Sequence, residues 1–512
     1  MRGPRRRWWR PARRCWWRVR RFSATRREPR RVSRPSGPRL PESAGGVRRT
    51  RTMARLIHER EFPFPVDRVW DWHMRPGALE RLMPPWEDAK VMGREGGFDD
   101  GGTVHVRVRR GPVKIDFKSR HTDFELGRLF TDEQVSGPTG SWEYRHEFEP
   151  RGSDACVLRD RIRYDPPLGA ATAALAGSTI EAELKRFFRF RNQRLAQDLA
   201  RHAAYDGPRL KVAITGASGF IGSALRHFLT TGGHEVLPIV RRRPDRDEGE
   251  IYWDPMERKI EGSRLEGVDA LVHLAGESLS DGRWNPARKR AIWKSRVVGT
   301  RVLADALNRL SDPPRVFVSS SAIGYYGNRG SEKLVERSRP GSGFLADLCR
   351  EWEGEALTAR RSGVRVVTLR TGLVLSPAGG ALGTMLLPFK MGIGGRLGSG
   401  RQYVSWIDHD DLVALIFHAL TDTSVRGPVN ATAPHPVPNA TFTTRLGHAL
   451  RRPTLLPVPS LAVRGMFGEM GRALLLDGQR VFPEAALRSG FRFDFEGIGE
   501  SLAFQLGRAP RR

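Results

Sequence analysis

The sequence predicts an α/β protein in which a doubly wound parallel sheet follows an α+β domain and precedes a small helical domain. Two observations predict this order. Over residues 210–370, short apolar strands alternate with amphipathic helices, as in parallel sheets that carry helices on both faces. Over residues 53–205, several alternating segments precede one long helical stretch, as in a bent antiparallel sheet that wraps a helix. The 512 residues are enough for about two to four domains.

The composition is that of a globular protein, with 39% hydrophobic and 28% charged residues. The cysteines, Cys15, Cys156 and Cys349, are far apart and show neither a disulfide framework nor metal-ligand spacing. This cysteine usage predicts a reducing, cytoplasmic location. No apolar run reaches the length of about 18 residues that a membrane-spanning helix needs.

The first 52 residues form an arginine-rich segment without helical or strand periodicity. They hold 19 Arg and 2 Glu, and therefore +17 of the formal net charge of +30. Such a composition cannot bury a core and predicts disorder over residues 1–52. It favours translation from an upstream start, with Met53 as the initiator, over an arm that stacks nucleic-acid bases on its tryptophans. We therefore expect no nucleic-acid partner.

The front domain is expected over residues 53–205. A strand at 56–64 leads through a Pro-Val-Asp turn into a helix at 69–82, whose apolar residues recur at helical spacing. Short alternating segments bounded by Gly, Pro or Asp predict antiparallel strands, and a continuous helical pattern predicts one long final helix. These strands are 103–108, 113–119, 142–148 and 156–164, and the long helix is 170–203.

The parallel sheet is expected in a domain at 209–450, after an Asp-Gly-Pro turn that serves as the linker. Its buried strands are short apolar runs, and its helices are the amphipathic segments between them. The strands are 211–215, 235–240, 270–274, 315–319 and 365–369, and the helices are 220–231, 286–309 and 343–361. A final domain, expected at 455–507, is short and helical with a phenylalanine-rich end.

A glycine-rich sequence joins the first of these strands to the first helix. Gly216 suits a tight turn, Gly219 suits the close approach of a phosphate, and Gly222 suits close strand–helix packing. The N-terminus of the following helix presents free N–H groups to an anion. This context predicts a Rossmann fold that binds a dinucleotide. The expected contacts are Gly216, Ala217, Ser218, Gly219, Phe220, Ile221 and Gly222.

The end of the second strand indicates which dinucleotide is preferred. An acidic residue there would bind the ribose hydroxyls of NAD, but the sequence has Arg241 and Arg242. Guanidinium groups form charge-assisted hydrogen bonds with phosphate, so these arginines favour NADP(H) over NAD(H). The next strand ends in Leu274, Ala275 and Gly276, where small residues leave room for the ribose that carries the nicotinamide.

These motifs resemble the extended short-chain dehydrogenase/reductases of the NAD-dependent epimerase/dehydratase type. The resemblance spans about 210–450 and rests on the glycine motif, on 274–276 and on Val-Ser-Ser-Ser-Ala-Ile-Gly-Tyr-Tyr-Gly at 318–327. Further motifs are similar to a largely uncharacterised epimerase-like family that ends in a small domain of unknown function. They are Trp253-Asp254-Pro255, Ala275-Gly276-Glu277, Arg283-Trp284, Ser295-Arg296, Trp352-Glu353, Gly400-Arg401-Gln402 and 405–408.

The front of the chain resembles SRPBCC domains, which are START-like and polyketide-cyclase-like, at 72–86 and at Gly137, Pro138 and Trp142. The resemblance implies a helix-grip fold with either an ordinary filled core or a cavity for a hydrophobic ligand. The aromatic residues that could line such a cavity are Trp70, Trp72, Trp86, Phe98 and Phe117.

The resemblance to the reductases also implies a Tyr-x-x-x-Lys pair, which this chain lacks. Phe344 stands at the tyrosine position and Leu348 at the lysine position. A tyrosine with its ordinary pKa near 10 needs a nearby cation to act as an acid–base group. The remaining catalytic candidates are Ser321, Tyr325 and Tyr326, with Arg296 or Arg350 as the cation. Each has a structural alternative: Ser321 as a hydroxyl that caps the end of a strand, and the two tyrosines as residues that pack in a loop.

The Asp-His-Asp-Asp sequence at 408–411 looks at first like a metal site. It stands directly before the apolar run 412–420, which is the position of a helix N-cap. The sequence therefore predicts that Asp410 or Asp411 caps this helix, and we expect no metal.

The sequence supports two functions. The first is an NADP(H)-dependent oxidoreductase or epimerase-like enzyme that acts by hydride transfer on an unidentified small molecule. The second is a non-catalytic NADPH-binding sensor or scaffold, which the missing Tyr and Lys favour. The glycine motif and Ser321 fit either function.

Overall fold

The structure is a computed structural model that describes residues 54–99, 101–165 and 170–508. The chain divides into two units, Met1–Thr50 and Arg51–Arg512, and all described residues belong to the second unit. The predictions of disorder and of an upstream start for residues 1–52 therefore lie outside the described residues. None of the helices in the described part combines the length and the apolar character that a membrane span requires.

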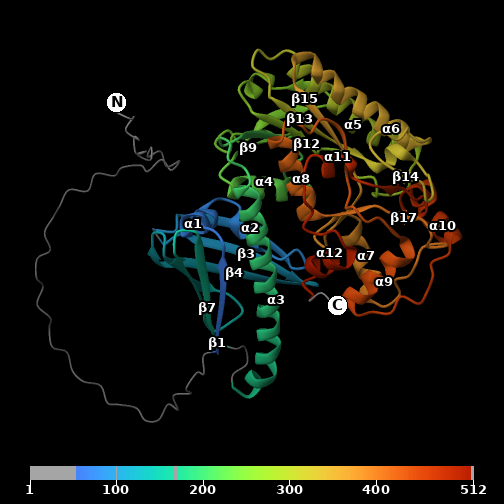
Figure 1. Cartoon of the computed structure of the whole chain (residues 1–512). Coiled ribbons are helices and arrows are strands. Elements are labelled where there is room, and N and C mark those ends of the chain that lie inside the picture. Colours follow the sequence, from blue (N-terminus) through green and yellow to red (C-terminus); the bar gives the residue numbers. More distant parts are fainter. Residues whose placement is uncertain (1–53, 100, 166–169, 509–512) are drawn as a thin grey trace, which may run out of the picture. The chain divides into compact units, whose positions relative to one another are not determined.

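The first part of the described chain is a seven-stranded antiparallel sheet packed against a long helix, α3 (Figure 1). Sheet residues Phe148 and Leu158 form one buried cluster with Leu195 and Leu199 of α3. The predicted α+β fold class of the front domain is confirmed. In sheet order, the strands are β1 (Ala54–Phe62), β7 (Ala155–Tyr164), β6 (Trp142–Arg151), β5 (Leu129–Ser136), β4 (Val113–Glu125), β3 (Thr103–Arg110) and β2 (Asp88–Glu95), and α3 is Ala170–Ala203.

The prediction of one helix at 69–82 is wrong, because the chain forms two helices there. α1 (Val66–Met74) and α2 (Ala78–Leu82) are separated at Pro76 and Gly77. Proline disfavours helical backbone at the residue before it, and Gly77 has a φ of 95°, which is a left-handed conformation. The apolar spacing of both helices continued across this break, and it therefore resembled one helix.

The second part contains an eight-stranded sheet whose first strand in the chain, β8, lies in its interior. All neighbouring strands pair in parallel except β10 and β11. This order is that of a Rossmann fold, and it brings the carboxyl ends of β8, β9, β12 and β13 to one edge. In sheet order, the strands are β11 (Lys259–Ile260), β10 (Ile251–Asp254), β9 (Glu235–Val240), β8 (Lys211–Thr215), β12 (Ala270–His273), β13 (Val316–Ala322), β15 (Arg365–Thr371) and β19 (Gly427–Ala431).

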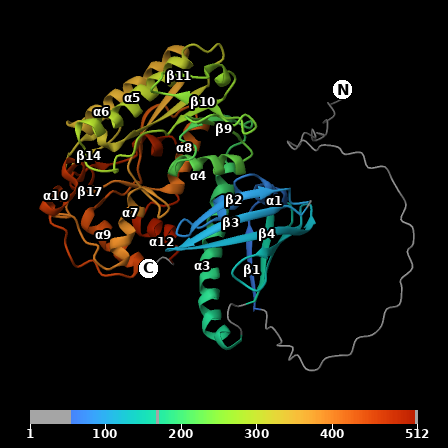
Figure 2. The same cartoon turned by 180° about the vertical axis from the view of Figure 1, so that it is seen from behind.

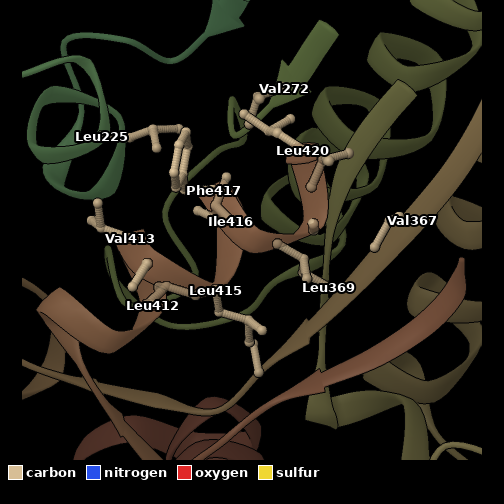
Figure 3. Close-up of a cluster of buried hydrophobic side chains, with 14 of the residues drawn as sticks. Leu225, Val272, Val367, Leu369, Leu412, Val413, Leu415, Ile416, Phe417 and Leu420 are labelled. Atoms are coloured by element: carbon tan, nitrogen blue, oxygen red, sulfur yellow. The ribbon is translucent and has the colours of Figure 1, made fainter. Parts of the chain in front are cut away.

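Helices cover both faces of this sheet, as a doubly wound fold requires. On one face, Leu225 of α4 and Phe417 of α8 pack with Val272 of β12 in a single buried cluster (Figure 3). On the other face, Leu303 of α5 and Ala356 of α6 pack with strand residues of a second cluster. The predicted α/β class is confirmed. The helices are α4 (Phe220–Thr231), α5 (Pro286–Leu307), α6 (Phe344–Leu357) and α8 (His409–Thr421).

Short helices and two-stranded pairs complete the described chain, and helices dominate its end as predicted. The domain limits 53–205, 209–450 and 455–507 stay predictions. The helices are α7 (Gly380–Lys390), α9 (Asn439–Leu450), α10 (Ser460–Gly471), α11 (Glu484–Arg488) and α12 (Ile498–Gln505). The strand pairs are β14 (Lys333–Leu334) with β21 (Arg480–Val481), β16 (Leu373–Leu375) with β18 (Trp406–Asp408), and β17 (Tyr403–Val404) with β20 (Val437–Pro438).

Candidate functional site

The glycine-rich turn lies between β8 and α4, at the carboxyl edge of the sheet. Gly216 has a φ of 71°, and its carbonyl oxygen accepts the Gly219 N–H at 2.9 Å. A Cβ at Gly222 would overlap that oxygen and would lie 2.8 Å from the Gly216 carbonyl carbon. No side chain caps α4 at Gly219. The first N–H groups of α4 are therefore free to bind an anion.

The end of β12 lies directly beside this turn. Thr215 Oγ1 accepts the N–H groups of Leu274 at 3.2 Å and Ala275 at 3.3 Å. The same hydroxyl lies 2.6 Å from His273 Nδ1. Burial lowers the pKa of His273 to about 3, so this imidazole is neutral and fixes the strand ends without adding charge. The two segments expected to bind the cofactor, 216–222 and 274–276, therefore lie side by side at the carboxyl edge of the sheet.

His409, which the sequence interpretation considered only as part of a metal-like sequence, contacts the start of α4. The His409 ring stacks on the Phe220 ring with 4.6 Å between centroids, and its Nε2 lies 3.3 Å from the Phe220 carbonyl oxygen. A Cβ at Gly379 would lie 2.9 Å from the Phe220 ring. The surroundings of Phe220 therefore come from segments more than 150 residues further along the chain.

Three arginines follow β9, and the two that the sequence interpretation assigned to the cofactor, Arg241 and Arg242, are not equivalent. Arg242 forms an ion pair with the buried carboxylate of Glu250 and donates to the Arg243 carbonyl oxygen at 3.0 Å. Arg241 is exposed, and in the described part of the chain it forms no ion pair. Arg241 is therefore available for a phosphate, and so is Arg243, whose exposed side chain also has no ion pair within the described residues.

Ser321 belongs to a buried polar network at the end of β13. Its hydroxyl donates to Glu353 Oε1 at 2.6 Å. Arg370 donates to both oxygens of the Glu353 carboxylate, each at 2.8 Å. All three side chains are buried. The sequence interpretation included Glu353 in a family motif but gave it no role, and it did not identify Arg370.

The two tyrosines after β13 have different environments. Tyr326 is fully buried, donates to Asn430 Oδ1 at 2.6 Å and accepts from Arg370 Nη1 at 3.0 Å. Burial raises the pKa of Tyr326 to about 12, although Arg370 opposes the rise. Tyr325 is half-buried, and the Arg370 guanidinium lies 3.4 Å from its ring centre. The Tyr326 hydroxyl therefore forms both of these hydrogen bonds inside the protein.

Phe344 and Leu348, which the sequence interpretation placed at the positions of the family's Tyr and Lys, are packed in an apolar cluster. Phe344 packs edge-to-face against Trp284 with 5.2 Å between centroids, and Leu348 is 2% exposed in the same cluster. Arg296 donates to the Glu277 carbonyl oxygen at 2.9 Å, and a Cβ at Gly276 would lie 3.2 Å from its guanidinium carbon. Burial lowers the pKa of Arg296 to about 10, which leaves it charged at neutral pH.

The other candidate cation, Arg350, forms its ion pair on its own helix and not at the end of β12. Arg350 is exposed and pairs with Asp347 on its own helix at 2.9 Å. Cys349 is buried, and burial raises the pKa of its thiol to about 12, so it is protonated at neutral pH. Of the two cations that the sequence offered, the structure brings Arg296 to the end of β12.

The acidic sequence at 408–411 is structural. Asp408 caps α8 by accepting the Asp410 N–H at 2.8 Å, so the prediction of a cap at Asp410 or Asp411 is wrong. The helix begins earlier than the apolar run indicated, because Asp410 and Asp411 face the protein interior. Asp410 pairs with arginines of the front domain, and Asp411 accepts the N–H groups of Asp494 and Phe495. Within the described ranges, no group of three His, Cys, Asp or Glu side chains is arranged to hold a metal ion.

Of the five aromatic residues proposed to line a front-domain cavity, Trp70, Trp72 and Phe98 belong to one cluster, and Trp86 and Phe117 pack elsewhere. Trp70 and Trp72 are buried in the core of the front domain. Trp86 packs instead against Phe190, in a different cluster. Phe98 stacks on His121, and Phe117 contacts Trp142 edge-to-face. Whether the front domain has a filled core or a cavity for a hydrophobic ligand stays a prediction.

Three family models match the chain. Residues 212–431 match the NAD dependent epimerase/dehydratase family, and residues 458–504 match a domain of unknown function, DUF1731. Residues 62–189 match the family of polyketide cyclase/dehydrase and lipid transport proteins. The fold and these matches define an NAD(P)-binding Rossmann protein of the short-chain dehydrogenase/reductase class with an SRPBCC-like front domain.

Relatives cover the second part of the chain. An epimerase family protein of Mycobacterium bovis is 46% identical over 297 residues, which are 58% of this chain and 98% of the relative. The human epimerase family protein SDR39U1 is 38% identical over 296 residues, which are 57% and 98% of the two chains. The chain belongs to the epimerase family, as its motifs implied.

Two solved structures are similar to this one. A nucleoside-diphosphate sugar epimerase of Corynebacterium glutamicum has a TM-score of 0.73 and 34% identity, and the match covers 88% of this chain and 90% of that one. Human SDR39U1 isoform 2, solved with NADPH, has a TM-score of 0.53 and 36% identity, with 57% and 97% covered. The first likeness extends over most of the front domain as well as the Rossmann fold.

Proposed function

We propose that this chain binds NADP(H) at the carboxyl edge of its eight-stranded sheet and acts on a small molecule as an oxidoreductase or epimerase. The observation that carries the proposal is the glycine turn, because α4 offers uncapped N–H groups beside the ends of β8 and β12. The human relative solved with NADPH supports the choice of cofactor. When bound, the cofactor supplies a hydride at its nicotinamide ring.

Arg241 is the residue that we assign to the phosphate that distinguishes NADP from NAD. Its side chain is exposed at the end of β9, whereas Arg242 is held by the carboxylate of Glu250. An arginine that is already paired with a buried carboxylate gains less binding energy from a phosphate than an unpaired arginine does. Arg242 therefore contributes less to phosphate binding than Arg241.

The proposal predicts tighter binding of NADPH than of NADH, by at least about tenfold, or about 1.4 kcal/mol. Arg241→Ala is expected to remove most of this preference, and Arg242→Ala to remove less. Fluorescence titration of both cofactors measures it. Arg361→Ala is the control, because this exposed arginine precedes β15 at the opposite edge of the sheet. Equal affinities for NADPH and NADH in the wild type would remove the assignment of Arg241.

In this proposal Ser321 orients the substrate oxygen. Its proton is donated to Glu353, and Arg370 fixes that carboxylate by holding both of its oxygens. The Ser321 oxygen keeps its lone pairs for a donor on the substrate. Tyr325 is the candidate acid, because the proton of Tyr326 is given to Asn430. Arg296, whose guanidinium lies beside Gly276, is the cation that we assign to the cofactor edge of β12.

Ser321→Ala and Tyr325→Phe are each expected to reduce the rate of NADP⁺ reduction with alcohol substrates, whose hydroxyl can donate to the Ser321 oxygen, because positioned acid–base groups contribute about 10²–10⁴-fold. The NADPH dissociation constant should not change. Tyr326→Phe is the matched comparison, and it should lower the melting temperature through its lost buried hydrogen bonds while the rate of the folded protein persists. Fast turnover that neither Ser321→Ala nor Tyr325→Phe changes would contradict this placement.

A second candidate function is a non-catalytic NADPH-binding sensor. Phe344 and Leu348 favour it, because both side chains belong to an apolar cluster where the family pair would transfer a proton. A Lys at Leu348 would bury its ammonium group in that cluster, so Phe344→Tyr alone is the informative variant. If the wild type binds NADPH but turns over no carbonyl substrate, the result favours the sensor function over the enzyme function.

A further inference from the structure

A cavity of about 210 Å³ lies between α3 and the end of the chain at α12. Both views show α12 beside α3 (Figures 1 and 2). Arg186 joins the two segments, because it donates to the carbonyl oxygens of Leu506 at 2.7 Å and Gly507 at 2.9 Å. The cavity is far from the glycine turn in sequence and shares no lining residue with it.

The cavity has two guanidinium groups without a partner. Arg189 and Arg508 both line it, and within the described residues neither side chain forms an ion pair or a hydrogen bond. The Nε atom of Arg508 is buried and has no acceptor. A buried donor without an acceptor is costly, so this atom favours a ligand that accepts a hydrogen bond.

The charge around Arg508 is mainly positive. Burial lowers the pKa of Arg508, and the positive charges of Arg186 and Arg451 lower it further. Of the two acidic residues in the lining, Asp494 is neutralised by Arg201, which donates to it at 3.0 Å. Glu500 is exposed. An anion placed between Arg189 and Arg508 would relieve the repulsion among the arginines.

Part of the cavity lining is aromatic and consists of Phe190, Phe495 and Phe504. The rings of Phe190 and Phe504 stack with 5.0 Å between centroids and an interplanar angle of 28°. Phe495 packs against Phe504 at 4.8 Å, and Trp86 packs against Phe190 at 5.0 Å. Such walls suit a flat apolar ring. The volume is below the roughly 300–1,000 Å³ of sites for drug-sized ligands, which limits the ligand to about one ring.

We propose that this cavity binds a small aromatic carboxylate, with its ring against Phe190 and Phe504 and its carboxylate between Arg189 and Arg508. Carboxylate and guanidinium groups match in geometry and charge, and Arg508 Nε supplies the donor that has no acceptor at present. The ligand would contact α3 and the end of the chain together. It would therefore stabilise the folded chain in proportion to its occupancy.

Isothermal titration of the full chain with benzoate tests the proposal, with benzamide as the neutral ligand of the same shape. Benzoate is expected to bind at millimolar concentration or below, and benzamide at least tenfold more weakly. Arg508→Gln and Arg189→Gln should each weaken benzoate binding, and together by at least tenfold. Glu500→Gln should strengthen it, because a negative charge leaves the rim. Lys185→Gln, an exposed site on α3 outside the lining, should change nothing.

Three results would overturn the proposal. They are an absence of benzoate binding to the wild type, equal binding of benzamide, and unchanged benzoate affinity in the Arg189→Gln, Arg508→Gln double variant. NADPH titration of the same variants separates the two sites, because the proposal predicts unchanged NADPH affinity in all of them. A failure of cofactor binding would therefore contradict the proposed function and leave the benzoate result to be judged independently.

Discussion

An alanine in place of Asp410 is expected to lower the free energy of unfolding by about 3–5 kcal/mol. The Asp410 carboxylate is buried and accepts from Arg81 Nη1 and from Arg194 Nε, each at 3.0 Å. Both guanidinium groups are buried, and Arg81 also donates to Asp198 at 2.8 Å. Removing Asp410 leaves the charge of Arg194 buried without its ion-pair partner. Urea unfolding at neutral pH measures the loss.

Two comparisons isolate the buried charge as the cause. Asp347→Ala breaks an exposed ion pair with Arg350 and should cost no more than about 1 kcal/mol. Arg194→Met combined with Asp410→Leu leaves Arg81 paired with Asp198 and should recover much of the loss, because no buried charge then lacks a partner. If Asp410→Ala costs no more than Asp347→Ala, this ion cluster does not hold the front domain and α8 together.

The effect of Asp410 also depends on pH. Burial disfavours the charged carboxylate, but Arg194 and Arg81 reverse this and hold the pKa of Asp410 below its ordinary value. A carboxylate with a lowered folded pKa contributes stability above its unfolded pKa near about 4, and this contribution is lost as the pH falls. The difference in stability between wild type and Asp410→Ala should therefore shrink below about pH 4.

Gly222→Ala is expected to reduce NADPH affinity by at least about tenfold and to destabilise the chain by about 1–3 kcal/mol, the usual cost of overpacking. The added Cβ would overlap the Gly216 carbonyl oxygen, which accepts the Gly219 N–H in the turn. Either α4 moves away from β8 or the turn opens, and both displace the N–H groups that bind the phosphates. Calorimetric titration and thermal unfolding measure the two effects.

Gly354→Ala is the matched control for this substitution. Gly354 lies inside α6, and a Cβ there would have nothing within 4 Å. Alanine in a helix interior is favoured over glycine by roughly 0.5–1 kcal/mol, so this variant should be slightly stabilised and should bind NADPH normally. If Gly222→Ala binds NADPH as well as Gly354→Ala does, the cofactor does not depend on this turn.

The sequence predicted those elements whose signal is local. The bounds of β8 and α4 agree with the prediction because a buried apolar strand, three glycines and an amphipathic helix follow one another directly. The sequence did not predict β5, because Asp132, Glu133 and Gln134 in its middle interrupt the apolar pattern. The sequence did not predict β2 for a similar reason: its residues are mostly exposed, and its apolar and polar residues alternate only weakly.

The site was predictable only where a motif marked it. The glycine turn and Ser321 stand in recognisable sequences, whereas Arg370 reaches Ser321 only through Glu353, after the strands have paired. The ion cluster at Asp410 joins residues more than three hundred positions apart, and no local pattern marks Arg81 as its partner. Such contacts depend on how the front sheet, α3 and α8 pack, which single-sequence periodicity does not encode.

A crystal structure of the chain with NADPH tests the central claim most directly. The account predicts the pyrophosphate at the N-terminus of α4, the ribose phosphate within hydrogen-bond distance of Arg241, and the reactive face of the nicotinamide toward Ser321. A dinucleotide bound away from the 216–222 turn would contradict the account. So would a nicotinamide whose reactive carbon faces neither Ser321 nor Tyr325.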